Sequence, residues 1–265
     1  MDQSSHTRRQ ALGRIASAGI GSLSVLGLAG CLQSDRDATL TVGDGRRADS
    51  GRVVKVRDVG VQTTLFHAAN GYSGIVGLEG TQFLVLAGVL GDAEFRLDLD
   101  DERYGQVTTI EGIDTGRTMY DGQRMGFDQN ASYRVIPLPT DVSPQEGSIV
   151  VPQDDGRDLR WRLPADARAA IANPPTFEVR DVAVEEVTED GRIPLSFSVT
   201  RTGGRREPFR FAIESDTVAG RDETLSTPGG ETVSWDAALG FDADASRPRF
   251  VLDWGFGQTA IDVPA

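Results

Sequence analysis

The sequence has very few of the side chains that build metal centres and nucleophilic active sites. It contains one cysteine, Cys31, and two histidines, His6 and His67, in 265 residues. A single thiol excludes an internal disulfide and a thiolate cluster, and two histidines do not complete a zinc or copper site without further nitrogen or sulfur ligands. We therefore expect no bound metal, no cofactor and no cysteine nucleophile.

Lysine is almost as scarce. Lys55 is the only lysine among the 27 basic residues, which face 40 acidic residues and leave a net charge of −13. A surface of this sign repels the phosphates of nucleic acids, so no nucleic-acid partner is expected. The excess of aspartate and the lack of lysine resemble the surfaces of proteins from extreme halophiles, in which hydrated carboxylates keep the chain soluble in concentrated salt. GC-rich codon usage also replaces lysine by arginine, but it does not explain the acidic excess.

The N-terminus has the layout of an export signal. Arg8 and Arg9 precede a modestly apolar segment, residues 15–28, that is interrupted by glycine and serine. Charge followed by an apolar run and small residues is typical of a signal peptide, and the arginine pair resembles that of twin-arginine (Tat) signals. Ala11 and Gly13 depart from that family, which usually has a bulky apolar residue and a lysine there. The apolar run is too short and too rich in glycine for a transmembrane helix, which needs about 20 predominantly apolar residues.

The export signal ends at the only cysteine. The run Leu28-Ala29-Gly30-Cys31 resembles the lipobox of lipoproteins, in which small residues admit the processing enzyme and the cysteine sulfur receives a lipid. The resemblance implies an anchor at the outer face of the cytoplasmic membrane, since each buried methylene of a lipid chain contributes about 0.8 kcal/mol. The alternative is an ordinary buried helix with a core cysteine. Such a helix rarely begins with paired arginines and ends in small residues before a polar segment.

Beyond the N-terminus, apolar residues recur mainly at every second position, as Phe95, Leu97 and Leu99 do. This period is typical of half-buried β-strands, and glycine-containing turns such as Asp155-Gly156 separate the segments. The pattern predicts an all-β fold of two antiparallel, immunoglobulin-like β-sandwich domains. The predicted strands fall within residues 52–58, 81–89, 94–100, 107–110, 132–139, 147–152 and 158–164, and within residues 176–187, 192–201, 208–215, 231–237, 248–255 and 258–264.

Two segments interrupt the alternation. Residues 164–172 are alanine-rich and are followed by Asn173-Pro174-Pro175, which predicts a short helix that ends there. Further on, the apolar phase breaks between Val179 and Val182, which indicates a β-bulge or a strand that changes sheets. The expected organisation is a signal peptide at residues 1–30, a lipidated cysteine and flexible tether at residues 31–51, a β-sandwich domain at residues 52–163, a connector at residues 164–175 and an immunoglobulin-like domain at residues 176–265.

Both halves resemble β modules of exported proteins. The second half is similar to immunoglobulin-like modules of archaeal surface proteins, on the strand that ends Ser198-Val199-Thr200-Arg201-Thr202-Gly203. The first half resembles a telokin-like sandwich of exported lipoproteins, on the stretches GTQFLVLAGV, FRLDLDDERY, GSIVVP and LRWRLP. These resemblances imply a fold and little chemistry, because one fold hosts many functions.

No catalytic constellation stands out. A Ser-His-Asp hydrolase would need His67 as its base, but the sequence has no G-x-S-x-G turn, and a lone histidine is more often structural or on the surface. Asp98 and Asp100 share one face of a predicted strand and could offer a catalytic dyad or a divalent-cation site. We prefer a solvated, salt-adapted acidic face, because no EF-hand or repeat pattern fixes a ligand cage.

The remaining candidate site residues are three tryptophans and one asparagine in a glycosylation sequon. Trp161, Trp235 and Trp254 lie in alternating segments, so we expect core residues rather than a carbohydrate-binding platform. Asn130 fits the N-x-S sequon and is a candidate glycosylation site on an exposed loop of an exported protein.

The sequence thus predicts a membrane-anchored lipoprotein outside the cytoplasm that is not an enzyme. We expect it to bind or support another extracytoplasmic component, such as a protein partner, through the loop within residues 105–132, since loops on a rigid sandwich commonly carry binding. The alternative is an extracytoplasmic hydrolase that uses the carboxylates of Asp98, Asp100 and Asp154. A solute-binding lipoprotein is disfavoured, because such receptors alternate strands with helices and helix is nearly absent from the pattern.

Overall fold

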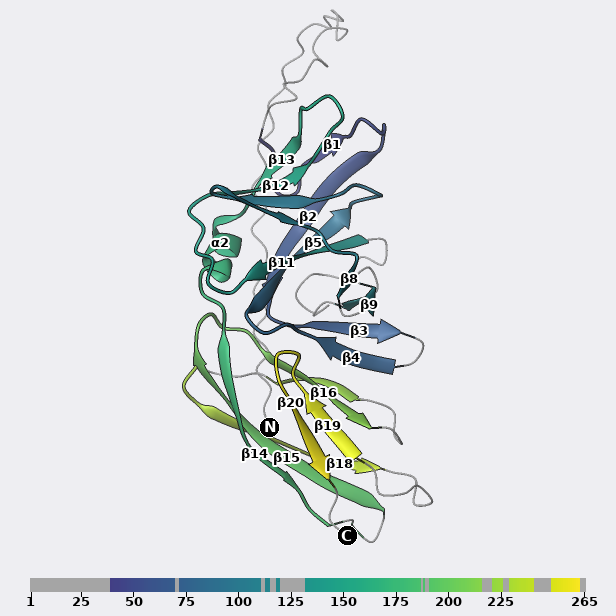
Figure 1. Cartoon of the computed structure of the whole chain (residues 1–265), viewed down its shortest axis with the longest axis vertical. Coiled ribbons are helices and arrows are strands. Elements are labelled where there is room, and N and C mark those ends of the chain that lie inside the picture. Colours follow the sequence, from purple (N-terminus) through teal and green to yellow (C-terminus); the bar gives the residue numbers. More distant parts are fainter. Residues whose placement is uncertain are drawn as a thin grey trace, which may run out of the picture. The chain divides into compact units, whose positions relative to one another are not determined.

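The computed structural model describes residues 39–262, apart from residues 70–71, 111–112, 115–117, 120–131, 187, 189–190, 216–220, 226–228 and 241–248. The described residues all belong to one compact unit, Arg36–Ala265. Within them the only helix is α2 (Ala165–Ile171), and the other elements are β-strands, so the predicted all-β class is confirmed. Figure 1 shows these strands coloured along the chain.

The strands of the first half include every one that the alternating pattern predicted there. They are β1 (Gly45–Arg47), β2 (Val53–Gln62), β3 (Leu65–Ala69), β4 (Tyr72–Val76), β5 (Thr81–Val89), β6 (Arg96–Leu99), β7 (Glu102–Gly105), β8 (Thr109–Ile110), β9 (Ile113–Asp114), β10 (Thr118–Met119), β11 (Ser132–Pro139), β12 (Gly147–Val151) and β13 (Leu159–Arg162). They form antiparallel sheets in the orders β1-β2-β5-β11, β13-β12-β6-β7, β10-β3-β4 and β8-β9. Strands β1, β3, β4, β7, β9 and β10 are not among the predicted ones.

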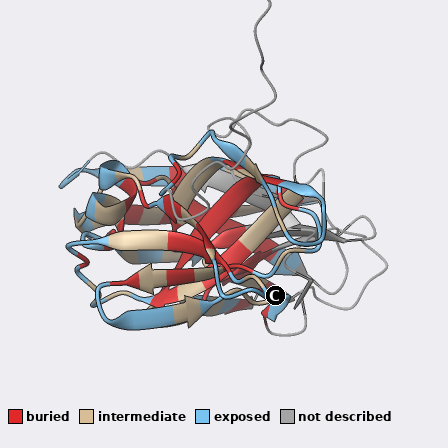
Figure 2. Ribbon diagram, turned by 90° about the horizontal axis from the view of Figure 1, so that it is seen from above, coloured by how far each residue is buried: buried red, intermediate tan, exposed pale blue. Residues whose placement is uncertain are grey.

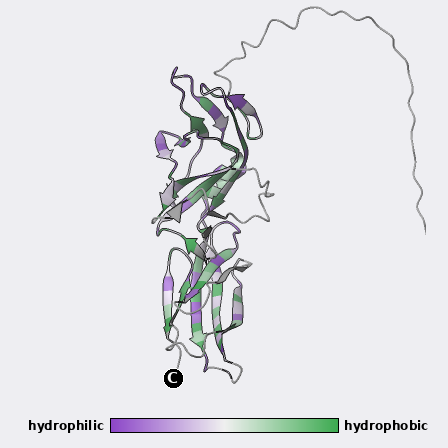
Figure 3. Ribbon diagram, turned by 90° about the vertical axis from the view of Figure 1, so that its right-hand side faces the viewer, coloured by the Kyte–Doolittle hydropathy of each residue, from purple (hydrophilic) through white to green (hydrophobic). Residues whose placement is uncertain are grey.

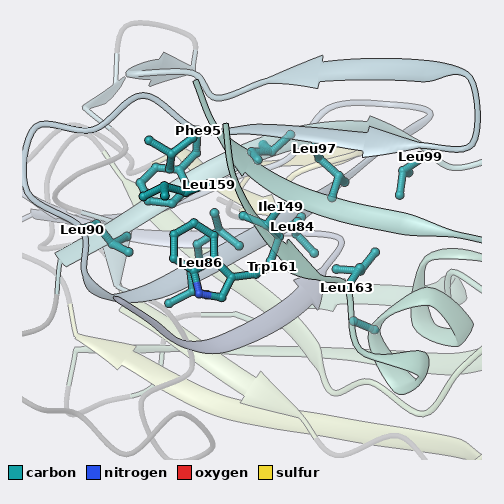
Figure 4. Packing of buried hydrophobic residues seen from close by; sticks show 14 of the residues in the cluster. Leu84, Leu86, Leu90, Phe95, Leu97, Leu99, Ile149, Leu159, Trp161 and Leu163 are labelled. Carbon is teal, nitrogen blue, oxygen red and sulfur yellow. The ribbon is translucent and has the colours of Figure 1, made fainter. Parts of the chain in front are cut away.

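The two four-stranded sheets of this half share one hydrophobic core. Leu84 and Leu86 of β5 contribute from the first sheet, and Ile149 and Trp161 contribute from the second. Figure 4 shows these side chains gathered between the strands that carry them. Trp161 is fully buried, as predicted, and its Nε1 donates a hydrogen bond of 3.0 Å to the Asp44 carbonyl. Antiparallel sheets that share a core in this way could pair into a sandwich.

Strand β5 is buried on both faces, so the prediction of a half-buried strand is wrong here. Leu84 and Leu86 face the shared core, whereas Phe83 and Val85 belong to a second cluster that also contains Leu65 of β3. The second face is covered because β3, β4 and β8 supply apolar residues to this cluster. Figure 2 shows such buried segments in the interior and exposed residues on the outer turns.

The packed chain begins before Arg52, earlier than the sequence suggested. Leu40 is only 7% exposed, its backbone N–H donates to the Arg160 carbonyl at 2.8 Å, and its carbonyl accepts from the Arg162 N–H at 2.9 Å. Strand β1 then pairs with the beginning of β2. Residues 39–51 are therefore part of the folded unit, although their glycines and aspartates favoured a flexible tether.

Helix α2 lies where the alanine-rich stretch predicted a helix. It buries Ala167 and Ile171 and stops before Pro174. Beside this stop lies the turn at Gly204, which has a φ of +74°. A Cβ on Gly204 would lie 1.9 Å from the Pro174 carbonyl oxygen, so the close approach of the two backbones requires glycine at this position.

The second half contains the six predicted strands and one more. They are β14 (Thr176–Val184), β15 (Arg192–Gly203), β16 (Phe209–Ser215), β17 (Arg221–Leu225), β18 (Thr232–Gly240), β19 (Arg249–Asp253) and β20 (Gln258–Asp262). They form two antiparallel sheets in the orders β14-β15-β18 and β17-β16-β19-β20. Strand β17 is the addition that the sequence did not predict.

Alternation works well in this half, as the hydropathy colours along the strands of Figure 3 show. Every second residue of β15, from Ile193 through Leu195 and Phe197, is buried in a cluster that takes side chains from both sheets. Phe197 packs edge-to-face against Phe211 with ring centroids 4.9 Å apart. Trp235 belongs to this cluster, as predicted.

The predicted irregularity in β14 is also confirmed. The register between β14 and β15 shifts between Arg180 and Ala183, and Asp181 has a φ of +52°. The break of apolar phase between Val179 and Val182 is the sequence signal of this bulge.

Candidate functional site

From the sequence we preferred a solvated acidic face for Asp98 and kept a catalytic or cation-binding role as the alternative, but in the structure guanidinium groups contact both of its oxygens. Arg96 Nε donates to Asp98 Oδ1 at 2.9 Å, and Arg160 Nη1 donates to Oδ2 at 3.1 Å. The Asp98 side chain is only 17% exposed. A carboxylate that accepts from two cations in this way has little left to offer a metal ion or a substrate.

Asp158 closes the arrangement into a ring of alternating charges on the face of the sheet opposite the core. Its Oδ2 accepts from Arg96 Nη2 at 2.8 Å and from Arg160 Nη2 at 3.4 Å. The strand register places Val150 of β12 between Arg96 and Arg160, and Val150 is fully buried. We infer that the arginine stems cover this valine while their charged ends pair with the aspartates.

The other two carboxylates of the predicted set have different surroundings. Asp100 has a φ of +47°, and its two oxygens accept from the backbone N–H groups of Glu146 at 2.9 Å and Gln145 at 3.2 Å. It therefore holds a loop in place. Asp154 is exposed in the turn between β12 and β13. The predicted dyad is not formed, because each carboxylate serves a separate local structure.

We expect Asp98→Asn to lower the free energy of unfolding by about 1–2 kcal/mol, because it removes the negative charge from a partly buried ring of ion pairs. Denaturant unfolding at fixed salt measures the change. The control is Asp92→Asn, which affects a strongly exposed pair with Arg52 and should leave stability nearly unchanged. A wild-type protein that calcium stabilises, with the effect lost in Asp98→Asn, would contradict this interpretation and restore the cation site.

Most of the other predicted site residues lie outside the described residues. This applies to Arg8, Arg9, Leu28, Ala29, Gly30, Cys31 and Asn130, and to most of the predicted contact region 105–132, namely residues 111–112, 115–117 and 120–131. His67 lies in β3, where its backbone pairs with Gly74 and Thr118. Trp254 packs against the core cluster of the second half but is only partly buried.

The described residues contain neither a metal-ligand cluster nor a membrane-spanning helix. No group of three or more histidine, cysteine, aspartate or glutamate side chains in this part of the chain is placed to hold a metal ion. None of its helices has the length and apolar character needed to cross a membrane.

The sequence did not point to the most deeply buried ionic group of the described residues, which lies where the two halves meet. Glu207 is 4% exposed. Its Oε1 accepts from Arg210 Nη1 at 2.7 Å and from the Thr63 backbone N–H at 3.0 Å, and its Oε2 accepts from Arg205 Nη2 at 2.6 Å. Thr63 and Glu207 are 144 residues apart in the chain, so this carboxylate ties the end of β2 to the segment before β16.

Arg205 extends the contacts to helix α2 and β5. Its Nη1 donates to the Ala170 carbonyl at 2.6 Å and to Gln82 Oε1 at 3.2 Å, and Gln82 Nε2 donates to the Ile171 carbonyl at 2.8 Å. Burial lowers the pKa of the Arg205 guanidinium, and the neighbouring Glu207 carboxylate opposes that shift. We call Thr63, Gln82, Arg205, Glu207 and Arg210 the junction cluster.

A cavity of about 400 Å³ opens beside the junction cluster. It is lined by the end of β2, by α2 and by residues 205–207 and 210. Of the lining residues, Asp166 and Arg206 are exposed, whereas Gln62 is 7% exposed and its Nε2 has no hydrogen-bond partner among the described residues. The only sequence signal was the charged run Arg205-Arg206-Glu207 directly after Gly203-Gly204.

The fold and the cavity define a β-rich protein with a polar cleft between two sets of sheets. Comparison with protein-family models and with curated proteins finds no match to this chain.

Proposed function

We propose that this chain is an exported lipoprotein, held at the outer face of the cytoplasmic membrane by lipid on Cys31. The observation that carries the proposal is the order of features before the folded unit. Arg8-Arg9, the apolar segment and Leu28-Ala29-Gly30 precede the only cysteine, and Leu40, nine residues further on, is buried in the folded unit. An export signal, a lipidation site and a folded extracytoplasmic module follow one another in this order in lipoproteins.

The distance from Cys31 to Leu40 sets how far the folded unit can be from the lipid. Eight residues, 32–39, separate them. Even a fully extended chain of this length spans only about 30 Å. Leu40 of the anchored protein therefore lies within about this distance of the lipidated cysteine.

The strand order supports the finer assignment to β-sandwich domains, with an immunoglobulin-like domain in the second half. The first, second and fifth strands of that half form one sheet, and the fourth, third, sixth and seventh form the other. In immunoglobulin constant-type domains the fourth strand pairs with the fifth instead. The two arrangements differ only in which sheet the fourth strand joins, and in this chain the fourth strand is β17. We assign the telokin-like sandwich to the first half on the sequence resemblance and on the shared core of its two larger sheets.

We further propose that the protein works by binding or supporting another surface component rather than by catalysis, in concentrated salt. The arginine partners of Asp98 and the backbone N–H partners of Asp100 support this choice, because they occupy the carboxylates that the alternative hydrolase would use. The net charge of −13 with a single lysine supports adaptation to salt. Residues 105–132, which the structure describes only in part, remain the proposed contact region.

Mass spectrometry of the protein extracted from membranes tests the proposal. We expect a chain that begins at Cys31, lacks residues 1–30 and carries a lipid-sized mass on the cysteine. An unmodified full-length chain in the soluble fraction would contradict both export and lipidation. A processed but unlipidated chain would retain export and overturn the anchor.

A further inference from the structure

We infer that the outer face of the sheet β13-β12-β6-β7 lies against an anionic phospholipid surface and orients the folded unit on the membrane. The inference rests on the proposed function, because it requires the lipid on Cys31, and it adds the surface that the anchored chain turns toward the bilayer. The charge of this face, the place where the chain from Cys31 joins it and an arginine-lined cavity at that place together support it.

The outer face carries a local excess of positive charge. Leu97 and Leu99 of β6 are buried in the core, so Asp98 and the residues paired with it lie on the other side of the sheet. The strand register and the ion pairs of Asp158 place six charged residues there: Arg96, Asp98, Arg103, Asp158, Arg160 and Arg162. Four arginines and two aspartates leave two positive charges in excess, in a chain whose net charge is −13. A positive region on such a chain favours an anionic partner.

The arginines of this face are more accessible than its aspartates. The side chains of Asp98 and Asp158 are 17% and 18% exposed, whereas that of Arg160 is 43% exposed. Arg103 and Arg162 are exposed, and the described part of the chain offers neither guanidinium an ion pair. Exposed acids adjoin the ends of these strands, namely Glu94, Asp101, Glu146 and Asp154. The surface available to an anion is therefore the middle of the face.

The chain that leads to Cys31 joins this sheet at its edge strand β13. Leu40 forms a parallel bridge with Trp161, and its backbone is hydrogen-bonded to Arg160 and Arg162. Eight residues separate Leu40 from Cys31, so a lipid on that cysteine keeps this edge of the sheet within about 30 Å of the anchor. The positive face and the membrane are thus held near each other by the chain itself.

A cavity of about 360 Å³ lies where the chain joins the sheet. Its lining includes the guanidinium-bearing Arg162 and Arg168 and the hydroxyl-bearing Thr39 and Ser148, and Glu146 is the one acid among its lining residues. Thr39 and Arg162 are exposed, so the cavity is accessible from solvent. Arginine binds phosphate oxygens through paired, charge-assisted hydrogen bonds. The phosphate of a lipid headgroup therefore matches the donors of this cavity.

Concentrated salt does not abolish contacts of this kind. Screening acts over distance, with a Debye length of about 3 Å at 1 M, and a guanidinium that is hydrogen-bonded to a phosphate lies within that distance. The anchor also makes binding of the face intramolecular, so a weak contact is still occupied. The face therefore orients the anchored chain and does not replace the anchor.

Labelling with phenylglyoxal, which modifies accessible arginines, tests the inference on the membrane-extracted chain reconstituted into vesicles. In phosphatidylglycerol vesicles we expect Arg103 and Arg162 to react about fivefold more slowly than in neutral detergent, since an anionic surface holds each arginine. The internal control is Arg57, which is exposed on β2 of the other large sheet and should react equally in both. Peptide mass spectrometry at fixed salt measures each rate.

Arg162→Glu separates contact with lipid from a change of fold. The charge reversal affects an exposed side chain, so we expect an unchanged thermal unfolding transition. In vesicles of this variant Arg103 should react at its detergent rate, because the face loses two units of positive charge. The matched variant Arg57→Glu should leave Arg103 protected.

Flotation of the same vesicles distinguishes failure of the inference from failure of the anchor. A chain that floats while Arg103 and Arg162 keep their detergent rates would overturn the inference alone. A chain that does not float would overturn the proposed anchor and this inference with it. Equal protection in phosphatidylcholine vesicles, or protection only in native membranes, would also overturn the inference, because a neutral headgroup or a protein would then occupy the face.

Discussion

Cys31→Ser should move the protein from the membrane fraction to the soluble extracytoplasmic fraction almost completely. A serine oxygen does not form the thioether through which lipoproteins carry their lipid, so the variant loses the whole anchor. Each buried methylene of that anchor contributes about 0.8 kcal/mol, so even one long chain dominates the membrane affinity of a chain with so acidic a surface. Fractionation in native salt, followed by immunoblotting, measures the change.

Two control variants distinguish a loss of lipid attachment from a loss of export. Gln33→Ser alters a residue just beyond the cysteine and should leave the protein in the membrane fraction. Arg8→Lys together with Arg9→Lys should instead retain an unprocessed chain inside the cell, because the arginine pair is the export element of the signal. A Cys31→Ser variant that stays membrane-bound would show that another part of the chain provides the attachment.

The folded unit of Cys31→Ser should be unchanged, because Cys31 belongs to the separate unit Met1–Asp35 and not to Arg36–Ala265. Equal unfolding transitions for the released variant and the detergent-extracted wild type would establish that the release is a loss of attachment and not of structure. This comparison also guards against proteolysis of an unfolded chain, which would lower the membrane signal without any change of anchoring.

The second half of the fold was the easier one to predict, and β15 shows why. Ile193, Leu195 and Phe197 alternate with polar residues because one face of the strand is buried and the other meets solvent. The apolar residues then recur at every second position, and this period alone is enough to predict the strand. The bulge near Asp181 was visible for the same reason, since an inserted residue shifts the apolar phase.

The first half was harder because its central strand has neighbours on both faces. Leu84 and Phe83 face different clusters, so β5 is continuously apolar and its alternation carries no information about which face is inside. The strands that cover the second face, β3 and β4, are short, and β3 follows β2 after only two residues. Local pattern does not reveal that a strand bends and enters another sheet.

The candidate site was missed for a related reason. Asp98 looked like a free carboxylate because Arg160, one of its partners, lies 62 residues away on another strand. Glu207 looked like one acid among many, and nothing near it in sequence indicates that Thr63 will approach it. Ionic partners that are distant in sequence are set by the order of strands in a sheet, as for Asp98 and Arg160, or by the packing of the halves, as for Glu207 and Thr63, and residue spacing encodes neither.

Glu207→Ala should lower the free energy of unfolding by about 3–5 kcal/mol, the second large effect expected of this chain. The substitution removes the carboxylate that Arg205, Arg210 and the Thr63 backbone all contact, and it leaves buried donors without this acceptor. Breaking a buried ion pair from one side costs more than the pair contributes, because the remaining charge stays out of water. Denaturant unfolding at several salt concentrations measures the loss.

The matched control is Glu178→Ala, which removes an acid from an ion pair with Arg180 on the outer surface of β14. There the two side chains are 44% and 66% exposed, so the expected cost is below about 1 kcal/mol and diminishes as salt rises. The cost of Glu207→Ala should persist in concentrated salt, because ions do not screen a buried pair effectively. If the two variants lose similar stability, or if salt removes the difference, then Glu207 does not hold the halves together in the way its contacts indicate. Arg205 and Arg210 would in that case find other acceptors or water when the carboxylate is gone.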